Sequence, residues 1–335
     1  MKSLDVILCM DRNFIFGAGA LVASLLKNNP NIEFFFHIFT IKEDIVVIDD
    51  ELFGRVKRNL PEHGNFQYLL YDVSKVPLYD KLKESGLNTR KIMAAIRLIV
   101  PCYCKTTSNR LLYLDADIIC LGDISELITM DLDNKTLAAV PWHEKSTQPF
   151  LEEGRFLIER SFCAGVMLID LECWKKDANE EKLIDFIIRE KPKFTDQTAL
   201  NVIYDKRFKI LPSKYDSFNV VKSDTLLLHY VSLKLWEPWN FNVSAPVLSA
   251  FRDYAKVFEP NVTKWVTFRR DKKALVNLSS YENPESRFAS KWMYRRMLKR
   301  RKYYAFFCFL LLHIYIKIKH KGIIGLILLK SNTGS

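Results

Sequence analysis

The sequence predicts an α/β protein built on a mostly parallel sheet. Its first third alternates short apolar runs of strand length with stretches that carry apolar residues at helical spacing, and strands separated by helices are typical of parallel sheets. The chain has 335 residues, of which 49% are hydrophobic, which is enough for a large core. In such sheets ligands bind beyond the carboxyl ends of the strands, so polar residues there are the first candidates for a site.

The predicted elements follow one another closely from the amino terminus. Residues 4–10 predict a buried strand, residues 19–29 a helix that ends before Pro30, and residues 33–39 a second strand. The pattern then predicts a helical stretch at 42–60, a strand at 66–70, a helix at 90–104, a strand at 110–114, a strand at 161–174, a helix at 196–204 and a strand at 225–230. The helix at 196–204 opens like an N-capped helix. Beyond about residue 255 the alternation is lost.

Two aspartates directly follow the strand at 110–114. Asp115 and Asp117 stand at positions i and i+2, so they point to the same side of an extended segment and can converge on one hard divalent cation. The spacing alone is weak evidence, because a second Asp-x-Asp pair occurs at 131–133. That second pair runs into a polar turn, whereas the first ends an apolar strand. This context favours a metal site at Asp115 and Asp117, and the alternative is a capped strand end.

Polar residues also follow two other predicted strands. Asp11, Arg12 and Asn13 come after the first strand, and His229 ends the last one. A histidine in this position is more often structural than a metal ligand. Its assignment therefore depends on other features that converge with it.

The cysteines and the amino terminus indicate a protein of the cytoplasm. Seven cysteines are scattered through apolar segments without a Cys-x-x-Cys pair, which supports neither a disulfide framework nor a zinc site and favours a reducing compartment. Asp5 and Asp11 interrupt the first apolar run, so we expect no signal peptide.

The net charge of +11 belongs to the carboxyl-terminal tail. From Ser286 onward there are twelve Lys or Arg and no Asp or Glu, so the first 285 residues carry 38 basic and 39 acidic side chains. Residues 303–316 form a nearly uninterrupted apolar run, shorter than the roughly 20 residues that a membrane-spanning helix needs. We therefore expect a domain at 1–255 and a basic extension at 256–335 that lies in the interface of an anionic membrane. The alternatives are a core helix and nucleic-acid binding, and no nucleic-acid motif accompanies the charge.

Five sequence blocks occur in the order seen in glycosyltransferase family 8, and the chain resembles that family over about residues 4–240. The blocks are the first strand with CMDRNF, then LYLDADI, FCAGVMLIDLECW, DQTALN and LHYVSLKLWEPW. The resemblance is strongest to bacterial lipopolysaccharide hexosyltransferases. It implies a GT-A fold, a Rossmann-like domain that uses UDP-glucose or UDP-galactose with Mn²⁺ or Mg²⁺ and transfers the sugar with retention of configuration.

The resemblance also implies roles for individual residues. Asp11 and Asn13 would contact the uridine, and Asp196 and Gln197 would line the donor sugar as catalytic residues. The implied metal ligands are Asp115, Asp117 and His229. The implied donor-binding residues are Cys9, Asp11, Asn13, Arg97, Asp115, Ala164, Gly165 and Lys234. A metal ion and a cation such as Arg97 stabilise the charge that develops on a pyrophosphate leaving group.

The chain departs from the family pattern at several positions. Cys163 stands where the family usually has Asn, and Trp142 stands where an acidic acceptor-site residue is common. In the last block Ser232 replaces Gly, and the phosphate lysine is either Lys234 or lost at Glu237. These departures put in doubt the donor contacts and the acceptor contacts rather than the fold.

Three functions are compatible with the sequence. The first is a hexosyltransferase that acts on a lipid-linked lipopolysaccharide core oligosaccharide, as a peripheral protein on the cytoplasmic face of the inner membrane. The second is a family 8 transferase that acts on a capsular or protein glycan. The third is a nucleotide-sugar binding protein without catalysis. The catalytic nucleophile, and a front-face reaction without one, remain open.

Overall fold

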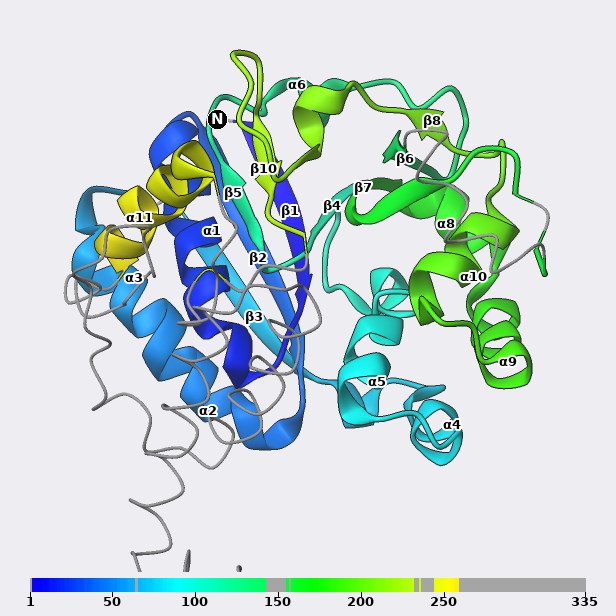
Figure 1. Ribbon diagram of the computed structural model, residues 1–335. Coiled ribbons are helices and arrows are strands. Elements are labelled where there is room, and N and C mark those ends of the chain that lie inside the picture. The colour runs from blue at the N-terminus through cyan, green and yellow to red at the C-terminus, as the bar shows by residue number, and fades with distance from the viewer. Residues whose placement is uncertain are drawn as a thin grey trace, which may run out of the picture. The chain divides into compact units, whose positions relative to one another are not determined.

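A seven-stranded mixed sheet forms the centre of the described fold, in the order β3-β2-β1-β4-β7-β6-β8 (Figure 1). This computed structural model describes residues 2–63, 66–142, 155–156, 158–231, 235 and 244–258. The strands of the large sheet are β1 (Lys2–Cys9), β2 (Ile32–Thr40), β3 (Phe66–Asp72), β4 (Arg110–Leu114), β6 (Leu137–Pro141), β7 (Phe162–Asp170) and β8 (Lys209–Ile210). A smaller sheet has the order β5-β10-β9, with β5 (Ile118–Cys120), β9 (Ser217–Phe218) and β10 (Leu227–His229).

The predicted parallel sheet is confirmed for four strands. β1 pairs in parallel with β2 and β4, and β2 pairs in parallel with β3. β7 runs antiparallel to both β4 and β6. The amino end of β7 therefore lies at the same edge of the sheet as the carboxyl end of β4.

Helices cover both faces of the large sheet. The α-helices are α1 (Ile15–Asn28), α2 (Ile45–Ile48), α3 (Gly54–Asn59), α4 (Tyr79–Glu84), α5 (Thr89–Ile96), α6 (Glu126–Thr129), α8 (Leu171–Asp177), α9 (Glu180–Glu190), α10 (Thr195–Ile203) and α11 (Ala245–Phe258). Successive side chains of β1 alternate between two cores, as a pleated strand requires. Leu4, Val6 and Leu8 pack with α1, α3 and α11, whereas Ile7 packs with α5, α9 and α10.

Short helical turns fill the connections between these elements. The predicted helical stretch at 42–60 is divided into η2 (Lys42–Asp44), α2, the π-helical turn η3 (Asp49–Phe53) and α3. The predicted helix at 90–104 is α5 followed by η6 (Val100–Tyr103). The remaining 3₁₀ turns are η1 (Arg12–Phe14), η4 (Pro61–His63), η5 (Val73–Lys75) and η8 (Ser213–Tyr215).

Two predicted boundaries were wrong. The strand predicted at 161–174 ends at Asp170, because the Asp170 carboxylate accepts a hydrogen bond of 2.9 Å from the Cys173 amide and caps α8. Leu171 and Trp174 are buried helix residues, so the apolar run continues across the boundary. The helix predicted at 196–204 begins at Thr195 without a side-chain cap, and Asp196 is buried instead.

The described chain continues past the predicted domain boundary at residue 255. α11 runs through this position to Phe258 and packs on α1, while the remaining residues of the predicted extension at 256–335 lie outside the described residues. No helix in the described part of the chain is long and apolar enough to cross a membrane.

We predict that Gly19→Ala destabilises the fold, because α1 and α11 approach too closely for a side chain there. A Cβ at Gly19 would lie 2.5 Å from ring atoms of Phe258, whose side chain is fully buried. Overpacking of this kind costs about 1–3 kcal/mol, more than the gain in helix propensity of about 1 kcal/mol. Urea unfolding should show a lower midpoint for Gly19→Ala. The same substitution should cost less in a Phe258→Leu background, and an equal cost in both backgrounds would contradict this packing.

Candidate active site

The candidate residues converge where β4 ends and β7 begins. β4 and β7 pair with Leu114 opposite Val166, and the Asp115 amide donates a hydrogen bond of 2.8 Å to the Gly165 carbonyl. This pairing brings the segment around Asp115 and Asp117 against Ala164 and Gly165. Cys9 ends β1, and β1 is the parallel neighbour of β4, so Cys9 lies at the same edge of the sheet.

The small sheet brings His229 to this edge. β10 runs antiparallel to β5, with His229 opposite Ile118, and the Tyr230 amide donates a hydrogen bond of 3.1 Å to the Asp117 carbonyl. As a result His229 Nε2 lies 3.3 Å from Asp117 Oδ1. The isolated histidine of the sequence is thus a direct neighbour of the aspartate pair.

Arg97, just after α5, holds three parts of the site together. Its guanidinium lies 2.9 Å from Asp115 Oδ1 and 3.0 Å from Asp196 Oδ2, and it donates a hydrogen bond of 3.0 Å to the Ala164 carbonyl. The guanidinium also lies 4.8 Å from the centre of the Tyr113 ring. Burial alone would lower the pKa of Arg97, but Asp115 and the other neighbours raise it well above its ordinary value. Arg97 is therefore a permanent buried cation.

The two residues predicted as catalytic have different surroundings. Burial raises the pKa of Asp196, with the Arg97 charge acting in the opposite direction. Gln197 is bonded to the main chain of β7: its Oε1 accepts a hydrogen bond of 2.9 Å from the Ala164 amide, and its Nε2 donates to the Phe162 carbonyl. Gln197 thus ties α10 to the first residues of β7.

Gly165 allows the site to close. A Cβ at this position would lie 2.3 Å from His229 Cε1, 2.9 Å from His229 Nδ1 and 3.1 Å from Asp115 Oδ2. The two separations from His229 are shorter than real atoms tolerate and the one from Asp115 is tight, so any larger residue would displace the imidazole.

The residues predicted at the uridine lie beyond the end of β1. Asp11 caps η1 by accepting a hydrogen bond of 2.8 Å from the Asn13 amide, and Arg12 between them forms an ion pair with Asp44. Asn13 is exposed. Desolvation raises the pKa of the Cys9 thiol, and Arg97 is the neighbouring charge that opposes the rise. The loop after β1 is therefore held in place by Asp11 and Arg12, while Asn13 faces solvent.

The donor chemistry of the central cluster fits a divalent cation. Asp115, Asp117 and His229 each offer one ligand atom, and these atoms all lie within 4.8 Å of one another. Carboxylate oxygens with one imidazole nitrogen suit Mn²⁺, and carboxylates suit Mg²⁺. Burial lowers the pKa of His229, but Asp216 and Asp117 raise it well above its ordinary value. A cation would replace one of the protons on this ring.

Three neighbours of the cluster escaped the sequence analysis. The Tyr113 hydroxyl donates a hydrogen bond of 2.9 Å to Asp115 Oδ1, a contact that the i, i+2 spacing on β4 could have indicated. Asp216 Oδ1 lies 3.0 Å from His229 Nδ1, and Phe218 stacks on Trp142 with 4.3 Å between ring centres. Both come from a segment without a recognisable pattern. Lys234, predicted at the donor phosphate, lies outside the described residues.

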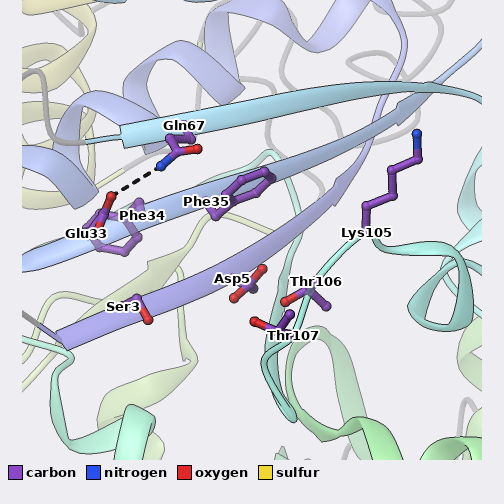
Figure 2. Close-up of a pocket in the computed structure, with 9 residues that line it drawn as sticks. All are labelled: Ser3, Asp5, Glu33, Phe34, Phe35, Gln67, Lys105, Thr106 and Thr107. Atoms are coloured by element: carbon purple, nitrogen blue, oxygen red, sulfur yellow. Dashed lines mark hydrogen bonds between the residues drawn. The ribbon is translucent and has the colours of Figure 1, made fainter.

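A separate cavity lies on the sheet near the amino ends of the strands. It measures about 420 Å³ and is lined by Ser3, Asp5, Glu33, Phe34, Phe35, Gln67, Lys105, Thr106 and Thr107. Figure 2 shows these side chains on β1, β2 and β3 and on the segment before β4. No residue predicted for the site lines this cavity, so we place the candidate active site at the carboxyl edge.

Comparisons with known proteins identify the class that this fold and site define. The structure is similar to the galactosyltransferase LgtC in complex with donor and acceptor sugar analogues, with a TM-score of 0.57 and 18% identity over 75% of this chain and 95% of that chain. The likeness shows the fold, an α/β fold of the GT-A type with a central mixed sheet.

Sequence comparison then gives the family. Residues 5–240 match the model of glycosyl transferase family 8, and the chain belongs to this family. It is 28% identical over 346 residues to the lipopolysaccharide glucosyltransferase WaaO of Escherichia coli K12, with 95% of this chain and 92% of that protein covered. It is 27% identical over 254 residues to the lipopolysaccharide 1,3-galactosyltransferase of Salmonella typhimurium, with 69% and 72% covered. The chain is a hexosyltransferase.

We predict that Gly165→Ala reduces glycosyltransferase activity by about 10-fold or more, the size of effect seen when the groups that orient a site are disturbed. The reason is the 2.3 Å contact between the added Cβ and the His229 ring. Steady-state kinetics and circular dichroism on the same preparations separate loss of activity from loss of fold. Gly54→Ala is the matched control, because its Cβ would meet only the mobile end of Arg58 at 3.3 Å and a main-chain oxygen at 3.7 Å. Equal activity of the two variants would contradict the placement of His229.

Proposed function

We propose that the chain transfers glucose or galactose, with retention of configuration, from a UDP-sugar to a lipopolysaccharide core oligosaccharide in a metal-dependent reaction. The observation that supports this most directly is the convergence of Asp115, Asp117 and His229 beside the buried Arg97 cation. Both lipopolysaccharide transferases described above support the acceptor class, and their names divide between glucose and galactose.

In this proposal different residues at the carboxyl edge of the sheet contact different parts of the UDP-sugar donor. Asp11 and Asn13, with Cys9 behind them, meet the uridine, and Asp115, Asp117 and His229 hold Mn²⁺ or Mg²⁺. When bound by these residues, the metal would supply positive charge to offset the charge that develops on the pyrophosphate leaving group. Lys234 adds a second positive charge at the phosphates. Gly165, which has no Cβ, leaves the space beside β7 to the His229 ring and the Asp115 carboxylate.

The sugar then lies against the amino end of β7 and α10. Both ends of the Gln197 amide bond to the main chain of Phe162 and Ala164, so Gln197 acts by keeping this surface rigid beside the sugar. Asp196 pairs with Arg97 and would have to break this ion pair before it could attack the sugar. This arrangement favours a front-face reaction: the acceptor hydroxyl oxygen bonds to the anomeric carbon as the bond between that carbon and the UDP oxygen breaks, and the hydroxyl proton passes to the departing phosphate oxygen.

The acceptor side of the proposal depends on Trp142 and on the tail. Trp142 stacks on Phe218, whose ring centre lies 6.0 Å from that of His229, and flat aromatic faces suit contact with sugar rings. The match to the Escherichia coli glucosyltransferase covers 95% of the chain and so includes most of the basic extension. We propose that this extension holds the enzyme on the cytoplasmic face of the inner membrane, where a lipid-linked acceptor is presented.

The second Asp-x-Asp pair provides a matched control for the metal site. Asp131 Oδ1 accepts a hydrogen bond of 2.9 Å from the Asp133 amide, and Asp133 has a positive φ of 51°, which Asn tolerates well. We expect Asp117→Asn to reduce metal-dependent hydrolysis of the UDP-sugar by about 100-fold or more, whereas Asp133→Asn should retain it.

The measurement is release of UDP from UDP-glucose and UDP-galactose by the full chain, with Mn²⁺, with Mg²⁺ and with a chelator. Hydrolysis that survives Asp117→Asn or the chelator would refute metal dependence. UDP binding without turnover of either donor would favour the sugar-nucleotide binding protein. An unchanged mass of the core oligosaccharide in a deletion strain would favour a capsular or protein glycan as the acceptor.

A further inference from the structure

A second group of potential metal ligands lies on the other side of the His229 ring. Cys163, Asp216 and His229 are all buried, and one ligand atom from each lies within 4.8 Å of the other two. Cys163 Sγ lies 3.8 Å from His229 Nδ1, and Asp216 Oδ1 lies 3.0 Å from the same nitrogen. Nδ1 of the ring therefore faces Cys163 and Asp216, whereas Nε2 faces Asp117.

The Asp216 carboxylate points to a missing partner in this second cluster. Its Oδ2 is buried and has no hydrogen-bond partner among the described residues, although the residue is only 1% exposed. A buried acceptor without a partner is uncommon and destabilising. A cation bound here would complete the coordination of the carboxylate.

The ligand types and their separations suit a thiophilic metal ion. Thiolate, imidazole and carboxylate are the common ligands of Zn²⁺. Tetrahedral Zn²⁺ with ordinary bond lengths places sulfur and nitrogen ligands about 3.6 Å apart and nitrogen and oxygen ligands about 3.4 Å apart. The observed separations of 3.8 Å and 3.0 Å are within about half an ångström of these values. The amide side chain usual at position 163 in the family would supply no such anionic ligand.

We propose that Cys163, Asp216 and His229 Nδ1 form a second metal site, selective for Zn²⁺ over Mn²⁺ and Mg²⁺. Sulfur provides the selectivity, because hard cations prefer oxygen ligands. Binding replaces the thiol proton and the Nδ1 proton of the ring with the metal and releases both protons to solvent. Sequence spacing could not reveal this site, because its three ligands come from β7, from the residue before β9 and from β10.

The two clusters compete through one imidazole ring, a consequence that depends on the proposed function. A neutral imidazole carries a single proton. When Nε2 ligates the catalytic cation, Nδ1 keeps the proton and donates it to Asp216. When Nδ1 ligates Zn²⁺, Nε2 keeps the proton and faces Asp117. Zn²⁺ should therefore inhibit the enzyme by removing one ligand of the catalytic metal.

The first test loads the full-length protein with Cd²⁺ or Zn²⁺ as probes. Cd²⁺ should give a thiolate-to-metal ultraviolet band in the wild type and in Cys173→Ser, and this band should be lost in Cys163→Ser. By titration, Zn²⁺ affinity should fall by about 100-fold or more in Cys163→Ser, while Mn²⁺ affinity in the presence of UDP, measured by electron paramagnetic resonance, should change by less than about threefold. A band of wild-type size in Cys163→Ser would overturn the proposal.

The second test measures competition directly. Zn²⁺ should weaken Mn²⁺ binding in the wild type, and Cys163→Ser should abolish this effect. Equal competition in both proteins would place Zn²⁺ at Asp115 and Asp117 and overturn the second site. X-ray absorption of the Zn²⁺-loaded wild type needs no variant: one sulfur in the first coordination shell supports the site, and a shell of nitrogen and oxygen alone refutes it. If the protein does not bind Mn²⁺, the proposed function is contradicted. The X-ray absorption experiment would still test the zinc site, because it does not depend on Mn²⁺ binding.

Discussion

The site depends on one buried cation. Arg97 bonds at once to Asp115, to Asp196 and to the Ala164 carbonyl, so it joins the end of β4, the start of α10 and the first residues of β7. Removing a charge from water is costly, and the buried Asp196 and the partly buried Asp115 without a cation between them would cost more. The arrangement is stable only with all the partners present. Arg97 therefore fixes the position of Asp115 before any donor binds. An active site that is preorganised to stabilise a transition state requires this.

The second constraint is the departure of the chain from the large sheet after Asp115. β5 leaves the central sheet and pairs with β10, which turns Asp117 towards His229. Gly165 permits the approach of that ring to β7. Residues 115–117 thus connect β4 of the large sheet to β5 of the small sheet, and the cluster of metal ligands forms at this connection. The same connection places Cys163 and Asp216 next to His229 Nδ1. The metal that the site binds therefore depends on which ring nitrogen of His229 acts as the ligand.

Much of the fold was predictable because its strands are apolar and its helices are regular. β1, β2 and α1 carry strong patterns, and position after β4 separated Asp115 and Asp117 from the surface pair at 131–133. The end of β7 was not predictable from apolarity, since Leu171 and Trp174 extend the apolar run into α8 while Asp170 ends the strand. Asp196 resembled a helix cap, but its ion pair with Arg97 draws it into the interior. Asp216 carried no local signal, because the residue that it contacts in the site, His229, lies on a different strand.

The most direct test of the account is where Mn²⁺ binds when UDP is present. Crystals of the full chain grown with both should be measured at the manganese absorption edge, and the anomalous difference map should show one peak between the carboxylates of Asp115 and Asp117 and His229 Nε2. The Asp216 carboxylate should then face His229 Nδ1 without touching the ion. A manganese peak elsewhere, or a UDP pyrophosphate bound away from this cluster, would contradict the central claim.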